Sequence, residues 1–126
     1  MAGARILIQQ EDAGVREAVR AMLTHRTGYE CVAVESWREV LQELVAERFD
    51  LAVCGIVGWE EAEFERVTRR VAVIICTGRQ DPAVYLRFQE MGAREILPMP
   101  FSREQLLKVV RKVMGERPSS GGLLPV

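Results

Sequence analysis

The sequence predicts an α/β fold in which helices cover both faces of a five-stranded parallel sheet. Short apolar runs alternate five times with amphipathic segments, and turn or capping residues separate them. Parallel neighbours need a crossover connection, which is right-handed, and each amphipathic segment can supply one. We therefore expect three layers, with functional residues just beyond the carboxyl ends of the strands.

The strands are recognised as short apolar runs. They are expected at Arg5–Gln9, Tyr29–Val34, Leu51–Cys54, Val71–Cys76 and Glu95–Leu97. The third run is apolar throughout and ends at Gly55, which is typical of a strand buried on both faces.

The helices are recognised by helical apolar spacing and by their caps. They are expected at Ala13–Thr27, from Ser36 through Arg48, at Glu60–Arg70, from Asp81 to Gly92, and from Ser102 through Met114. Gly28 would end the first helix in a left-handed conformation. Pro82 suits the first position of the fourth helix, and Ser102 with Gln105 forms a capping box for the last.

Length and charge exclude several classes of protein. The 126 residues suit one domain, expected at 1–116, and the Pro/Gly/Ser-rich segment 117–126 is expected to be a disordered tail, with a docking segment as the alternative.

Seventeen basic and 18 acidic residues give a formal charge of −1, so nucleic acid and membranes are not expected as partners. No apolar run approaches the roughly 18 residues of a membrane span, and no secretion signal is evident, so a cytoplasmic location is expected.

Cysteine and histidine give no sign of a metal site. Cys31, Cys54 and Cys76 are odd in number and lie among apolar residues, so we expect buried small side chains. Cys54 and Cys76 could meet at neighbouring strand ends, which leaves a redox role open, whereas a nucleophile there would lack a base. His25, the only histidine, is expected on the surface near a helix end, with phosphotransfer or metal ligation as the alternative.

Four stretches resemble the receiver domain of two-component response regulators, the CheY-like family, over Arg5 to Met114. They are "RILIQQEDAGVREAVRAML", "FDLAVCG", "VAVIICTG" and "GAREILPMPFSREQLLKVVRKVM". The resemblance implies a flavodoxin-like sheet with strand order 2-1-3-4-5. It also implies a cis peptide bond before Pro100. The family holds Mg²⁺ with two acids after the first strand, phosphorylates an Asp after the third, and uses a Thr or Ser and a Lys beside the phosphoryl group.

Most of these family positions are neutral in this chain. Counting from Arg16, the acid pair falls on Gln10 and Glu11, the phospho-acceptor on Gly55, the hydroxyl on Thr77, the lysine on Met99 and the switch aromatic on Ile96. A register slip of one residue would make Glu11 and Asp12 the acid pair. Glycine offers no nucleophile and methionine no charge. The resemblance thus indicates a pseudo-receiver without a cofactor, in which Mg²⁺ is not expected and Glu11 with Asp12 is only a weak cation site.

The connection from Gly55 to Thr77 is shorter than is usual in the family. The third helix should therefore be cut to two or three turns. Trp59 in this connection could cover the vacated pocket or the sheet's edge, or could be ordinary packing.

The resemblance also implies a partner face on the fourth helix, fifth strand and fifth helix. Its candidate residues are Arg79, Tyr85, Arg87, Arg94 and Arg103. We expect a non-enzymatic signalling module that binds another signalling protein, or a second copy of itself, without Asp phosphorylation. The alternative is a small-molecule or nucleotide sensor that uses the altered strand-end pocket.

Overall fold

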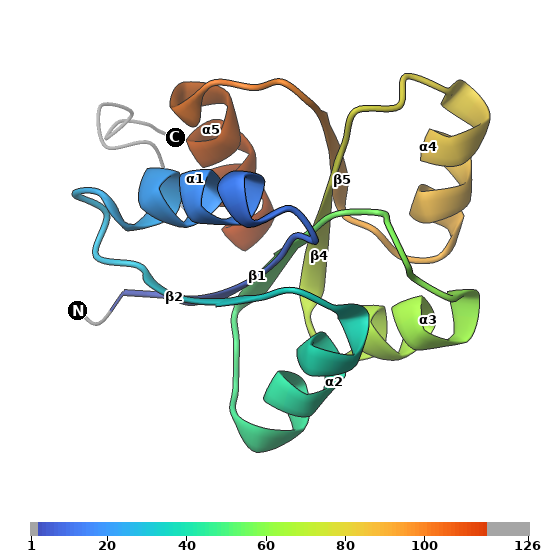
Figure 1. Cartoon of the computed structure of the whole chain (residues 1–126), viewed down its shortest axis with the longest axis horizontal. Coiled ribbons are helices and arrows are strands. Elements are labelled where there is room, and N and C mark those ends of the chain that lie inside the picture. Colours follow the sequence, from blue (N-terminus) through green and yellow to red (C-terminus); the bar gives the residue numbers. More distant parts are fainter. Residues whose placement is uncertain (1–2, 116–126) are drawn as a thin grey trace, which may run out of the picture.

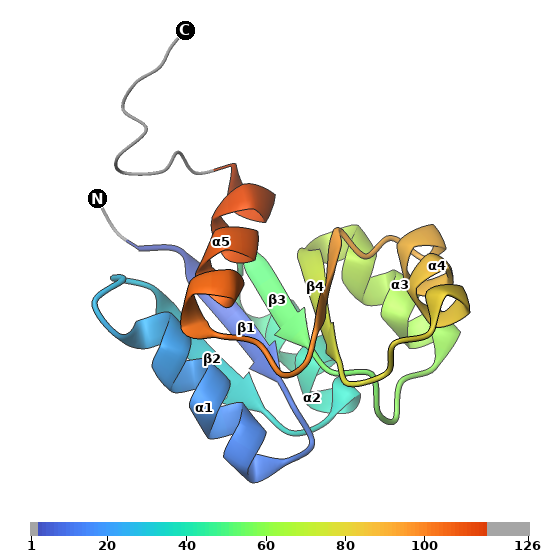
Figure 2. The ribbon, with the colours of Figure 1, turned by 90° about the horizontal axis from the view of Figure 1, so that it is seen from above.

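The computed structural model describes residues 3–115, which form a central parallel sheet with helices on both faces (Figures 1 and 2). The strands are β1 (Arg5–Gln9), β2 (Glu30–Val34), β3 (Leu51–Cys54), β4 (Ala72–Thr77) and β5 (Glu95–Pro98). The helices are α1 (Ala13–Thr24), α2 (Trp37–Ala46), α3 (Glu61–Arg70), α4 (Pro82–Glu90) and α5 (Arg103–Met114). The order β2-β1-β3-β4-β5 confirms the predicted flavodoxin-like topology.

Alternation along the strands divides the core into two layers. Leu7, Ala52 and Val73 point to the face covered by α2, α3 and α4, whereas Ile6, Val53 and Ile74 point to the face covered by α1 and α5. Figure 2 shows α1 and α5 together on one side of the sheet. Within residues 3–115, no helix is long and apolar enough to cross a membrane.

An aromatic cluster fills the core beneath α3 and α4. Phe64 packs edge-on against Trp37 and Phe88, with ring centroids 5.6 and 5.3 Å away. Trp59 lies 4.8 Å from Phe88 and 5.8 Å from Phe64. Trp59 is thus a packing residue on this face of the sheet, which is the second of the two roles that the sequence allowed.

The helix starts at Ser36, Asp81 and Ser102 agree with the predicted caps, whereas α1, α2 and α4 end two or three residues earlier than expected. The predicted capping box of Ser102 with Gln105 forms, and Ser36 forms another with Glu39. Helix α1 ends at Thr24 instead of Thr27, because Arg26 adopts a left-handed conformation (φ 57°) before Gly28 does (φ 81°). The left-handed conformation of Arg26, two residues before Gly28, was not foreseen.

Two smaller expectations are met in the second half of the chain. Helix α3 has ten residues, or about three turns. The Met99–Pro100 peptide bond is cis. The predicted tail, residues 117–126, lies outside the described residues.

Candidate functional site

Gln10 and Gly55 meet at the carboxyl end of the sheet, as the counting from Arg16 predicts. β1 and β3 pair in register through Gln9 and Cys54, and the Gly55 N–H donates to the Gln9 carbonyl at 2.9 Å. A Cβ atom added to Gly55 would lie 3.1 Å from Gln10 Oε1. The φ angle of Gly55 is not positive, so its backbone does not require glycine. Instead, the amide of Gln10 occupies the space that a larger side chain would need.

Gln9 joins three strand ends and was not singled out from the sequence. Its side chain is 1% exposed, donates from Nε2 to the Glu35 carbonyl at 2.8 Å, and accepts from the Gly55 N–H at Oε1 at 3.1 Å. It therefore ties the end of β1 to the loops that follow β2 and β3. The sequence did contain a sign of this role, because Gln9 is a polar residue in an otherwise apolar stretch of strand and a buried amide needs hydrogen-bond partners.

The acids that follow β1 do not converge on this point. Asp12 caps α1, because its Oδ1 accepts from the Val15 N–H at 2.9 Å. Glu11 is exposed. Arg16 donates to the Gln10 carbonyl at 2.8 Å and to the Glu11 carbonyl at 3.4 Å, which closes the loop onto the helix. Across residues 3–115, no group of three or more His, Cys, Asp or Glu side chains is arranged to hold a metal ion.

Thr77 and Met99 meet through the main chain. Thr77 is fully buried at the end of β4, its carbonyl accepts from the Met99 N–H at 2.7 Å, and its Oγ1 accepts from the Arg79 N–H at 3.0 Å. Met99 is half-buried and packs on the α1–α5 side of the core, whereas Ile96 packs on the other side. Met99 and Ile96 are thus both packing side chains.

Two buried donors within the described residues have no partner, Trp37 Nε1 at the start of α2 and Gln10 Nε2 beside Gly55. Gln10 is 5% exposed, and its Nε2 makes no hydrogen bond within the described residues. An unpaired buried amide N–H costs about 1–3 kcal/mol. The site is therefore neutral and nearly closed, with one unused donor beside Gly55.

The cysteines do not form a redox pair. Cys54 and Cys76 lie on neighbouring strands but point to opposite faces of the sheet, and both thiols are free. Burial raises the pKa of Cys76 to about 12 and that of Cys31 to about 11, and it raises the pKa of Cys54 as well. These thiols are protonated at neutral pH, so none is an activated nucleophile.

The residues expected on the α4–β5–α5 face are not brought together. Arg87 forms an ion pair with Glu61 of α3, and Arg103 donates to the carbonyls of Met22 (3.0 Å) and His25 at the end of α1. Arg94 lies at the opposite, amino end of the strands, while Tyr85 remains half-buried on α4. Two of the expected arginines therefore hold neighbouring helices together. His25 itself is exposed, as expected.

Comparison with known proteins identifies the family of this chain and agrees with its fold. The profile of the response regulator receiver domain matches residues 6–111. The chain is 26% identical over 128 residues to the DNA-binding transcriptional regulator NtrC of Rhizobium meliloti, covering 94% of this chain and 26% of that protein. It is 28% identical over 116 residues to the response regulator MprA of Mycolicibacterium vanbaalenii, covering 87% of this chain and 50% of that protein. The chain thus spans a quarter to a half of the length of these relatives.

Solved structures give the same fold. The CheY-like receiver domain protein of Methanospirillum hungatei JF-1 superposes with a TM-score of 0.82 at 22% identity, covering 90% of this chain and 95% of that one. The receiver domain of the putative response regulator NarL from Mycobacterium tuberculosis gives 0.83 at 18% identity, covering 93% and 100%. With the family profile spanning all five strands, this chain belongs to the response regulator receiver domain family of two-component signalling.

Proposed function

We propose that this receiver domain is a pseudo-receiver, which signals by binding a partner protein without being phosphorylated on aspartate. The observation that carries the proposal is Gly55, which takes the end of β3 where the family resemblance puts the acceptor. Its N–H is shared between the main chain and side chain of Gln9, and Gln10 covers it. A position without a side chain cannot accept a phosphoryl group.

The surrounding residues support the same proposal. A phosphoryl group needs positive charge beside it, and Met99 supplies none where the family resemblance expects lysine. The Thr77 hydroxyl is already held by the Arg79 N–H. Without phosphorylation, any change of state must come from the free energy of binding a partner or ligand.

The oxygen atoms that could serve as metal ligands at this end of the sheet do not fit Mg²⁺. That ion prefers near-octahedral oxygen ligands, usually including one or two carboxylates. Here Gln10 offers a neutral amide, Asp12 is engaged as a helix cap, and Glu11 is exposed. We therefore propose that the domain works without a bound metal.

The proposal is tested by incubating the chain with acetyl phosphate and Mg²⁺ and measuring its intact mass at neutral pH. We expect no gain of a phosphoryl group, while a receiver domain that retains its acceptor aspartate, treated in parallel, gains one. A stoichiometric phosphoryl group that alkali releases would contradict the proposal, because that lability is the property of an aspartyl phosphate.

A second candidate function follows from the unused donor of Gln10. A small ligand that accepts a hydrogen bond from Gln10 Nε2 would remove the cost of leaving this group unpaired. Such a sensor would show an unfolding temperature that rises with ligand concentration. Screening nucleotides and metabolites by thermal shift on the chain and on Gln10→Leu separates the two functions, because only a ligand of this site loses its effect in the variant.

A further inference from the structure

We propose that the groove between α2 and α3 binds an acidic, partly apolar segment of a partner protein. This inference rests on the proposed function, because it names the surface and the partner chemistry through which a pseudo-receiver would act. The surface lies apart from the α4–β5–α5 face.

The groove combines apolar and positively charged side chains. It is a hollow of about 440 Å³ lined by Leu41 and Val45 of α2 and by Arg66, Arg69 and Arg70 of α3. Figure 1 shows the two helices side by side below the sheet. Val45 is 74% exposed, although valine is a residue that the core usually buries. An apolar side chain of a partner would find contacts here.

The charges in the groove are uncompensated. No carboxylate lines this hollow, and within residues 3–115 none of its three arginines takes part in an ion pair or a side-chain hydrogen bond. Arg87, on the neighbouring helix α4, instead pairs with Glu61 of α3. Glutamate or aspartate on a partner could therefore bind these guanidinium groups without displacing an existing partner.

Helix stability accounts for this cluster only in part. Glu63 and Glu65 lie three and four residues before Arg66 and Arg69, which favours the helix. Arg66 in turn lies three and four residues before Arg69 and Arg70, and like charges at these spacings destabilise a helix by about 0.2–0.5 kcal/mol per pair. Arg69 and Arg70 in the last turn interact favourably with the helix dipole, but Arg66 lies before that turn. An acidic ligand would relieve the repulsion among all three.

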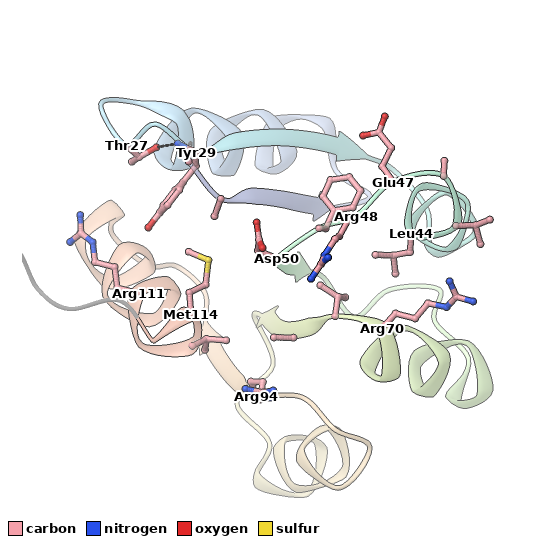
Figure 3. A pocket seen from close by; sticks show the side chains of 18 of the residues that line it. Thr27, Tyr29, Leu44, Glu47, Arg48, Asp50, Arg70, Arg94, Arg111 and Met114 are labelled. Atoms are coloured by element: carbon pink, nitrogen blue, oxygen red, sulfur yellow. Dashed lines mark hydrogen bonds between the residues drawn. The ribbon is translucent and has the colours of Figure 1, made fainter. Parts of the chain in front are cut away.

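The groove opens into a second basic hollow at the amino ends of the strands. Val45 and Arg70 line both hollows, and the second one, of about 1320 Å³, also carries Arg26, Arg48, Arg94 and Arg111. Figure 3 shows Arg48 near its centre, with Arg70, Arg94 and Arg111 around it. Its two carboxylates, Glu47 and Asp50, are both bonded to Arg5. A bound segment can thus place further acidic residues beyond the groove.

A protein segment suits this surface better than other anions do. The apolar pair Leu41 and Val45 offers nothing to a phosphate backbone, and the net charge of −1 gives a long polyanion no general attraction to the chain. A small phosphate ligand would make charged contacts alone, whereas a peptide gains both apolar and charged contacts.

The test uses the full chain and a fluorescein-labelled helical peptide with leucines on one face and glutamates around them. Affinity is measured by fluorescence anisotropy for the chain, for Arg66→Glu/Arg69→Glu, for Val45→Ser, and for the matched control Arg38→Glu/Lys108→Glu. The control makes the same change in net charge at two exposed basic residues that line neither hollow. Circular dichroism shows whether each variant is folded.

We expect the acidic peptide to bind the native chain. Its affinity should be about tenfold lower for Arg66→Glu/Arg69→Glu, a few-fold lower for Val45→Ser, and unchanged for the control variant. The inference is wrong if the acidic peptide does not bind, if a peptide with glutamine in place of glutamate binds equally well, or if both reversals weaken binding equally. It is also wrong if single-stranded DNA or ATP binds in competition with the peptide. Repeating the titration after acetyl phosphate treatment separates the two proposals, because a phosphorylated chain that binds the peptide contradicts only the pseudo-receiver assignment.

Discussion

The two ends of the sheet differ in how their polar groups are used. At the carboxyl end, Gln9, Gln10 and Thr77 are buried, neutral and mostly hydrogen-bonded to the strand ends. At the amino end and along α3, arginines line two hollows without ion pairs within the described residues. The residues at the carboxyl end are part of the core, whereas the arginines are available to bind an acidic partner. The polar groups at the carboxyl end are thus used in packing and hydrogen bonding, whereas the arginines at the other end have no ion-pair partner within the described residues.

Raising the pH should cause the largest loss of stability among the changes considered, because buried thiols lie near the carboxyl ends of β3 and β4. The native pKa values of Cys54 and Cys76 are raised by burial, that of Cys76 to about 12, so above pH about 8.5 the unfolded chain loses thiol protons that the native chain keeps. The free energy of unfolding should be constant with respect to these groups below that pH, and should fall above it by about 1.4 kcal/mol per pH unit for each thiol.

Urea unfolding under reducing conditions at pH 8 and pH 10 measures this fall. Cys31, whose pKa is raised to about 11, adds to it, and Cys76→Ala should have a shallower dependence on pH because one of the three thiols is gone. An unchanged slope in that variant would mean that the thiol is not buried as the structure shows.

Removing the buried amide of Gln9 should have the next largest effect. Gln9→Leu leaves the Glu35 carbonyl without its partner and deprives the Gly55 N–H of one of two acceptors. We expect a loss of about 1–3 kcal/mol in the free energy of unfolding by urea. Gln42→Leu, on the exposed side of α2, is the matched control and should change stability by less than about 0.5 kcal/mol. Equal effects would remove the distinction between the buried end and the surface.

Asp12 should behave as a helix cap and not as a metal ligand. Asp12→Ala removes the acceptor of the Val15 N–H, so we expect a loss of about 1 kcal/mol, the same with and without Mg²⁺. Thermal unfolding of both proteins in the two buffers checks this. A Mg²⁺-dependent rise in the unfolding temperature of the native chain that the variant lacks would restore the acid pair Glu11 and Asp12 as a cation site.

Neutralising the groove arginines should have the smallest effect on stability. Arg66→Ala removes the like-charge repulsion of Arg66 with Arg69 and Arg70, and it breaks no ion pair. The free energy of unfolding should therefore stay within about 0.5 kcal/mol of the native value. Arg87→Ala serves as the comparison, since it breaks the ion pair with Glu61 that joins α4 to α3. A large loss in Arg66→Ala would assign this arginine a structural role and weaken the case for a binding surface.

The sequence was sufficient for the strand order and for the proximity of Gln10 and Gly55. Alternating runs, Ser36, Ser102 and Pro82 defined the elements, and counting from Arg16 placed Gln10 beside Gly55. These inferences depend on the local pattern of apolar and capping residues, and on the alignment of the strand ends in a parallel sheet.

Long-range side-chain directions could not be obtained in this way. Arg87 and Arg103 were expected on a partner face, which stays a prediction, and their bonds to α3 and α1 could not be foreseen because they depend on which acid or carbonyl lies within reach in the folded chain. The bridging role of Gln9 likewise depends on two loops that are 26 and 46 residues away in sequence. The groove appears only when α2 and α3 pack, since charged residues on a single helix look like a solvated surface.

The most direct test of the central claim restores the lost site. The triple variant Gln10→Asp/Gly55→Asp/Met99→Lys returns the acid pair, the acceptor and the lysine, and shortening Gln10 makes room for the new Cβ atom that would otherwise lie 3.1 Å from Gln10 Oε1. Intact-mass measurement after treatment with acetyl phosphate and Mg²⁺ should show a phosphoryl group on the triple variant and none on the native chain. A native chain phosphorylated to the same extent would contradict the claim that this end of the sheet has lost its chemistry.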